Sequence, residues 1–238
     1  MCFHNRNTNM TPKVKINGEE IETVNCIKYL GFSINNDIKR FYSLKDTIND
    51  IKIRSNVILN NFRSIDSAAK VCLFNSQCLS LYGCCLWDLG SKEVTDLEVA
   101  WRKSSRCILG ISNRTHCEFI PHLMNTNDVR SIIEQRMINF YINGFQHDNK
   151  LISHIFRNSL LTSMSYYVRN LNVIIHKHKL KYKDVFDNCR QVRFKVRLPE
   201  QEWKIELIKQ LIYERDFNCN DILNKQEIND ILFFLCTD

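Results

Sequence analysis

Residues that make tight turns are scarce along this sequence: only six glycines and three prolines occur in 238 residues. A β-sandwich or barrel needs many such turns, whereas long helices need few. With 44% hydrophobic and 25% charged residues, the composition is that of a folded protein. The sequence therefore predicts a mainly α fold, in one large domain or two small ones.

The first forty residues are the exception, because their pattern is that of strands. Asn17-Gly18 is a strong signal for a two-residue hairpin turn, which would set Lys15 opposite Glu20 and Val14 opposite Ile21. Apolar residues alternate again in "CIKYLGFSIN", residues 26–35, and predict a third strand. We expect a small antiparallel β-hairpin or three-strand element at the N-terminus.

From Phe41 onward the hydrophobic spacing becomes helical. A narrow apolar stripe predicts one long helix and consists of Leu44, Ile48, Ile51, Ile58 and Phe62. Further helices are predicted over about residues 67–86, 93–109, 128–146, 149–161, 164–179 and 220–235, with another opened by Pro199. Asp66 is the expected N-cap of the second helix. In the third helix, Arg102, Lys103 and Arg106 are expected to point outward.

Positive charge is concentrated in residues 176–197, which hold eight lysines and arginines against two aspartates. Within this segment, four lysines alternate with His178, Leu180 and Tyr182; they are Lys177, Lys179, Lys181 and Lys183. Such a run is a candidate contact for nucleic-acid phosphates, with some base stacking. The alternative is a solvated linker.

The eleven cysteines do not indicate a disulfide framework or a zinc site. No apolar signal-peptide core is present at the N-terminus, so we expect an intracellular protein, in the nucleus or cytoplasm, with reduced thiols buried as small apolar groups. His116, Cys117 and His122 lie close together in sequence, but no CxxC motif supplies a second pair of zinc ligands. No apolar run is long enough for a membrane crossing.

Three stretches occur in the order "VKINGEEIETVNCIKYLGFSIN", "LYGCCLW" and "LEVAWRKSSRCILGISNRTH". Together they resemble the C-terminal part of reverse transcriptases from non-LTR retrotransposons (the LINE, Jockey and CR1-like elements). The resemblance covers about residues 1–145 and implies a division into four parts. These are a palm-end and primer-grip β element (1–36), a thumb-like helical bundle (37–112), a post-thumb helical region (113–175), and a basic segment with C-terminal helices (176–238).

The resemblance also implies nucleic-acid contacts in the first two parts. In a primer grip, Lys28 would meet a phosphate, Tyr29 would pack on a sugar or base, and Gly31 would let the backbone approach closely. The alternative for Tyr29 is a packing role between strand and thumb. On the thumb, a basic and amide edge could follow one strand of the template–primer duplex; it consists of Lys45, Asn49, Lys52 and Asn56. The alternative is that this edge is simply the solvent-exposed face of an amphipathic helix.

Catalysis by this family requires two Mg²⁺ ions held by a palm aspartate and an aromatic-Ala-Asp-Asp turn. No Asp-Asp pair occurs in this sequence. We therefore expect no catalytic residue, no metal ligand and no cofactor in this chain, and no polymerase activity from it alone. The expected partners are an RNA/DNA template–primer duplex and the upstream fingers and palm portion of the polymerase. Two alternatives remain: a non-functional relic, or a helical protein-interaction module with the acidic tail as a docking face.

Overall fold

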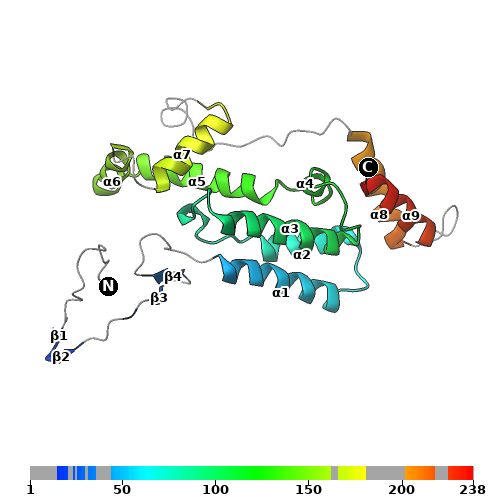
Figure 1. The fold of residues 1–238 in the computed structure, drawn as a ribbon, viewed down its shortest axis with the longest axis horizontal. Helices are drawn as coiled ribbons and strands as arrows, with labels where there is room; N and C mark the ends of the chain where they lie inside the picture. Colours follow the sequence, from blue (N-terminus) through cyan, green and yellow to red (C-terminus); the bar gives the residue numbers. More distant parts are fainter. Residues whose placement is uncertain are drawn as a thin grey trace. The chain divides into compact units, whose positions relative to one another are not determined.

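A computed structural model describes residues 15–20, 24, 26–29, 32–35, 44–161, 166–180, 202–217 and 225–237. The chain divides into two compact units, Met1–Lys45 and Asp46–Asp238. The first contains short strands and the second consists of helices (Figure 1). The prediction of a mainly α chain is confirmed.

In the first unit, strand β1 (Lys15–Ile16) pairs antiparallel with β2 (Glu19–Glu20), and Lys15 lies opposite Glu20. Both residues of the connecting turn have positive φ, 53° at Asn17 and 86° at Gly18. Asparagine and glycine tolerate this left-handed region better than other residues, which explains why the chain turns here. The pair expected farther from the turn, Val14 and Ile21, lies outside the described residues.

The prediction of one continuous strand over residues 26–35 is wrong. Strand β3 (Cys26–Tyr29) pairs antiparallel with β4 (Phe32–Asn35), and Tyr29 lies opposite Phe32. Only Leu30 and Gly31, which lie outside the described residues, separate the two strands in sequence. Among the described residues there are two separate two-stranded sheets instead of one three-strand element.

Helices α1 to α9 and one short 3₁₀ helix follow in the second unit. Their bounds are α1 (Lys45–Asn61), α2 (Ser67–Cys78), η1 (Cys84–Leu86), α3 (Lys92–Leu109), α4 (Phe119–Leu123), α5 (Val129–Phe145), α6 (Lys150–Leu161), α7 (Tyr166–Lys177), α8 (Glu202–Phe217) and α9 (Lys225–Thr237). Figure 1 shows α3 running between α1 and α5, with α2 beside it. Large side chains from these helices are almost fully buried, among them Phe74, Leu97, Trp101, Ile133 and Met137. Their burial supplies the hydrophobic stabilisation of this unit.

Helix starts follow the capping rules. The carboxylate of Asp66 accepts a hydrogen bond from the Ala69 amide at 2.6 Å, so its predicted N-cap role is confirmed. Ser91 and Asp128 cap α3 and α5 in the same way. At the C-terminus of α3, Gly110 adopts φ 61°, the left-handed conformation that commonly ends a helix.

Helix α2 ends at Cys78, eight residues earlier than predicted. The chain then turns through two residues with positive φ, Leu81 (39°) and Gly83 (74°). The Arg136 guanidinium on α5 donates hydrogen bonds to the carbonyls of Leu79, at 3.0 Å, and Ser80. These bonds satisfy backbone acceptors that a longer helix would have paired internally.

The expectation that the thiols are buried is only partly right. The six cysteines of residues 44–161 are free, and Cys78 and Cys84 are buried. Cys72, Cys107 and Cys117 are instead exposed. None of the helices in the described part of the chain has the length and hydrophobicity that a bilayer crossing requires.

Candidate nucleic-acid interface

Helix α1 is fixed to the rest of its unit by one face. Ile51 and Ile58 are buried, while Phe62, predicted to continue this stripe, is 37% exposed. Between the two isoleucines, the hydroxyl of Ser55 lies 3.3 Å from that of Ser104 on α3. The Arg54 guanidinium donates a hydrogen bond of 2.6 Å to the Gln77 carbonyl on α2. These contacts hold α1 in a defined orientation.

The predicted basic and amide edge of α1 lies at the surface of the helix. All four side chains are exposed, and we call them the α1 edge: Lys45, Asn49, Lys52 and Asn56. Spacings of four, three and four residues place them on one stripe, which extends about 16 Å along the helix axis. Exposed acids on the same helix adjoin this stripe. One of them, Asp50, lies 3.8 Å from the Arg54 guanidinium.

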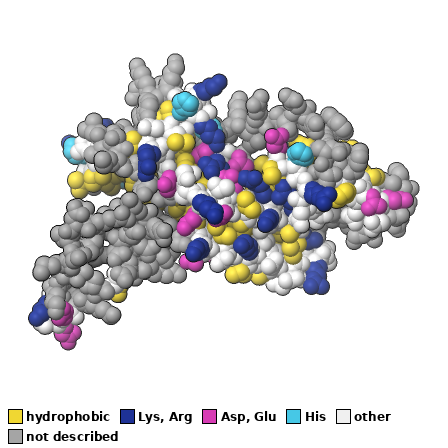
Figure 2. Space-filling model, in the orientation of Figure 1, with side chains coloured by type: hydrophobic (Ala, Val, Ile, Leu, Met, Phe, Trp, Pro, Cys, Tyr) yellow, Lys and Arg dark blue, Asp and Glu magenta, His cyan; other side chains and the backbone are white. Residues whose placement is uncertain are grey.

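Cationic groups extend this surface beyond α1. Figure 2 shows lysine and arginine side chains spread over the face formed by α1 and α3, with acidic side chains interleaved. At the turn after α1, the Lys70 ammonium donates a hydrogen bond of 3.3 Å to the Arg63 carbonyl. The sequence pattern did not single out Lys70, because it belongs to the next helix and only the tertiary turn brings it here.

The basic segment at the end of α7 is only partly described. Lys177 donates hydrogen bonds to both carboxylate oxygens of Glu134, at 2.8 and 2.9 Å. His178 Nε2 lies 2.8 Å from the same carboxylate, which is 1% exposed. The Lys177 ammonium is therefore committed to an ion pair between α7 and α5.

Lys179 is exposed and lies where α7 ends, with φ 51°. The Leu180 amide donates a hydrogen bond to the Ile175 carbonyl, and the Lys179 amide donates one to the His176 carbonyl, which is the pattern of a Schellman cap. This cap turns the chain sharply and leaves the Lys179 side chain in solvent. Lys181 and Lys183 lie outside the described residues.

The proposed primer-grip residues are described only by their backbone. Lys28 and Tyr29 belong to β3, where Lys28 lies opposite Ser33 and Tyr29 opposite Phe32. Gly31 lies outside the described residues.

No protein-family model, curated protein or solved structure matches this chain. The resemblance to reverse transcriptases therefore rests on the sequence motifs alone.

The burial of Arg106 contradicts the prediction made from the sequence. Arg106 was expected to point outward from α3, but it is 7% exposed. Its Nε and Nη2 donate hydrogen bonds to the Thr115 carbonyl at 3.2 and 2.6 Å. The loop after α3 folds back over the helix and covers this arginine, a tertiary effect that helical periodicity cannot show.

Acidic and basic side chains also form an interhelical network near Arg106. The Glu98 carboxylate accepts a hydrogen bond of 2.7 Å from Arg102 and another from Arg130 on α5. These groups join α3 to α5. In the part of the chain that the structure describes, no cluster of three or more histidines, cysteines or acids could hold a metal ion.

Proposed function

We propose that this chain binds a nucleic-acid duplex without sequence preference, as the primer-grip and thumb portion of an RNA-directed DNA polymerase of the non-LTR retrotransposon type. The order of the sequence motifs supports the family assignment. In this proposal, an upstream fingers and palm portion supplies the catalytic aspartates and their Mg²⁺ ions. This chain supplies contacts that hold the template–primer.

The α1 edge is the observation that carries the proposal. Its two ammonium groups can meet backbone phosphates, and its two amides can hydrogen-bond to phosphate or sugar oxygens. Such contacts position a duplex but carry no information about base sequence. Other side chains of α1 hydrogen-bond to α2 and α3, through Arg54 and Ser55, so the edge is presented on a helix that is joined to both.

The charges near the edge set the expected strength of binding. The two lysines of the edge are accompanied by exposed acids on the same helix, Asp46 and Asp50. Because these acids repel phosphates, we expect modest affinity that depends steeply on salt. The commitment of Lys177 to Glu134 makes α1, rather than the end of α7, the principal contact surface.

The proposal can be tested with a double substitution and a charge-matched control. Lys45→Gln with Lys52→Gln removes two charges from the α1 edge. Lys92→Gln with Lys150→Gln removes two charges from exposed positions at the starts of α3 and α6. Binding to a fluorescent RNA–DNA hybrid would be followed by anisotropy at low salt, with circular dichroism to verify helix content.

We expect the α1 double variant to bind about tenfold more weakly than the unmodified chain, since two phosphate contacts are lost. The control variant should change affinity by less than about threefold, through long-range charge alone. Equal losses in the two variants would show that binding does not use the α1 edge.

A further inference from the structure

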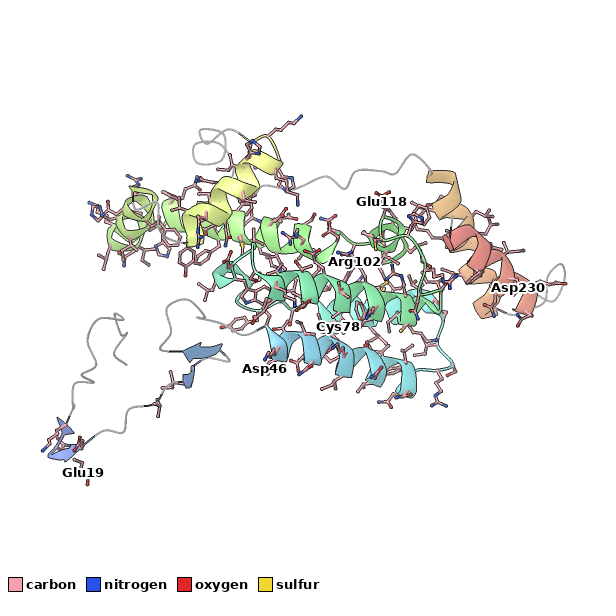
Figure 3. All side chains as sticks on the ribbon, in the orientation of Figure 1. Glu19, Asp46, Cys78, Arg102, Glu118 and Asp230 are labelled. Carbon is pink, nitrogen blue, oxygen red and sulfur yellow. The ribbon has the colours of Figure 1, made fainter. Side chains whose placement is uncertain are left out.

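Cys117 lies between two arginine side chains of α3. Its sulfur is 3.6 Å from Arg102 Nη1 and 3.5 Å from Arg106 Nη2. The two arginines are four residues apart, so they occupy neighbouring turns on one side of the helix. Figure 3 labels Arg102 together with Glu118, the residue that follows Cys117, in this part of the molecule.

Both guanidinium groups are fixed by partners other than the thiol. Arg102 is held by the Glu98 carboxylate at 2.7 Å, and Arg106 by two hydrogen bonds to the Thr115 carbonyl. Their N–H groups therefore point at the sulfur without any rearrangement. This preorganisation is what a stabilised anion at the sulfur position requires.

The surroundings of Arg106 also favour an anion here. Arg106 is a buried cation, and among the described residues its partners are the neutral Thr115 carbonyl and the Cys117 sulfur, with no carboxylate. Burying a charge without a counter-ion is costly. A thiolate at Cys117 would supply the missing negative charge.

The electrostatics of Cys117 agree with this geometry. Partial burial alone would raise the pKa of the thiol, but hydrogen bonds and charge from Arg102 and Arg106 outweigh it and lower the pKa. Glu98 is already held by two arginines, and Glu118 is exposed to solvent. Cys117 is itself exposed, so reagents can reach it.

We propose that Arg102 and Arg106 hold Cys117 as a thiolate nucleophile, and that Cys117 is a modification site for low-molecular-weight disulfides such as glutathione disulfide. The Cys117 sulfur attacks one sulfur of the disulfide, the S–S bond breaks, and one thiolate leaves and takes a proton from water. A mixed disulfide remains on Cys117. The two electrons of the new S–S bond come from the attacking thiolate, and the leaving sulfur is the group that is reduced.

Two other exposed thiols in the same chain, Cys72 and Cys107, serve as internal references. The full reduced chain would be alkylated with limiting iodoacetamide at pH 7, and the rate at each cysteine followed by peptide mass spectrometry. We expect Cys117 to react at least about threefold faster than either reference, since the thiolate is the reacting form. Brief exposure to glutathione disulfide should place one glutathionyl group on Cys117 before the other two.

Arg102→Gln tests whether the arginines cause the high reactivity of Cys117. The Arg102 side chain is 29% exposed, so its loss should leave the fold intact. Lys103→Gln, at the next and exposed position, removes the same charge without touching the sulfur. We expect Arg102→Gln to slow the alkylation of Cys117 at least about threefold, and Lys103→Gln to leave the alkylation rate of Cys117 unchanged. Equal rates at the three cysteines, or equal effects of the two substitutions, would overturn the proposal.

Discussion

The Lys177 ammonium lies 2.8 Å from Glu134 Oε1, and this ion pair joins the last turn of α7 to the second turn of α5. The Glu134 carboxylate is 1% exposed, whereas the Lys177 side chain is 46% exposed. His178, the next residue in the chain, contacts the second carboxylate oxygen. A buried acid is thus satisfied by two consecutive residues at a helix end.

Lys177→Met should destabilise the helical unit by about 1–3 kcal/mol, because it leaves a buried carboxylate with one of its two basic partners. The free energy of unfolding would be measured with urea and followed by circular dichroism. Lys150→Met is the matched control, since it alters an exposed lysine and should change stability by less than about 0.5 kcal/mol. Equal stabilities of the two variants would mean that the ion pair contributes nothing.

Gly144 on α5 faces the Phe156 ring on α6. A Cβ atom added there would lie about 2.5 Å from the Phe156 ring, nearer than non-bonded carbons can come. Alanine is the better helix former by about 1 kcal/mol, but the clash should cost about 1–3 kcal/mol. Gly144→Ala should therefore destabilise the chain in urea unfolding.

The same substitution in a Phe156→Ala background separates these two effects. Without the ring, the added methyl group has room, so Gly144→Ala should become neutral or stabilising. If the change costs the same free energy with and without the Phe156 ring, close packing is not the reason for glycine at this position.

Cys78 gives the protein an alkaline dependence of stability. Burial raises the pKa of this thiol from its ordinary value of 9.0 to about 11, although the Arg54 charge acts in the opposite direction. Between these two values the unfolded chain releases a proton that the folded chain retains. Stability should therefore fall as the pH rises from about 9 to about 11, by at most about 1.4 kcal/mol per pH unit from this group.

Cys78→Ala removes this contribution. Whatever its effect at neutral pH, its unfolding free energy should decline less steeply than that of the unmodified chain over the same interval. Urea denaturation at several alkaline pH values would measure both slopes. Parallel slopes would show that Cys78 does not ionise differently in the folded and unfolded states.

Local signals predicted the helices well where one residue type decides the outcome. Asp66 was recognised as an N-cap because its short carboxylate can reach the free amides of the first turn. The end of α2 was missed because hydrophobic residues continue past Cys78. Leu81 has a left-handed backbone conformation, with φ 39°. Leucine has no preference for this conformation, so the sequence does not predict a turn there.

Of the two candidate sites, one could be predicted from the sequence and the other could not. The exposure of the α1 edge follows from helical spacing, which places Lys52 on a different side from Ile51 and Ile58. The burial of Arg106 and its position beside Cys117 depend on the loop that returns over α3. A helical wheel places Arg106 on the outer side of α3, so its burial could be recognised only from the structure.

The salt dependence of binding tests most directly our proposal that the chain binds a nucleic-acid duplex through the phosphates of its backbone. The affinity for an RNA–DNA hybrid would be measured from about 25 to 200 mM salt, with two hybrids of unrelated sequence. We predict a negative slope of log affinity against log salt of at least about 1.5, from two phosphate contacts, and equal affinities for the two hybrids. Absence of binding at the lowest salt, or an affinity independent of salt, would contradict the account.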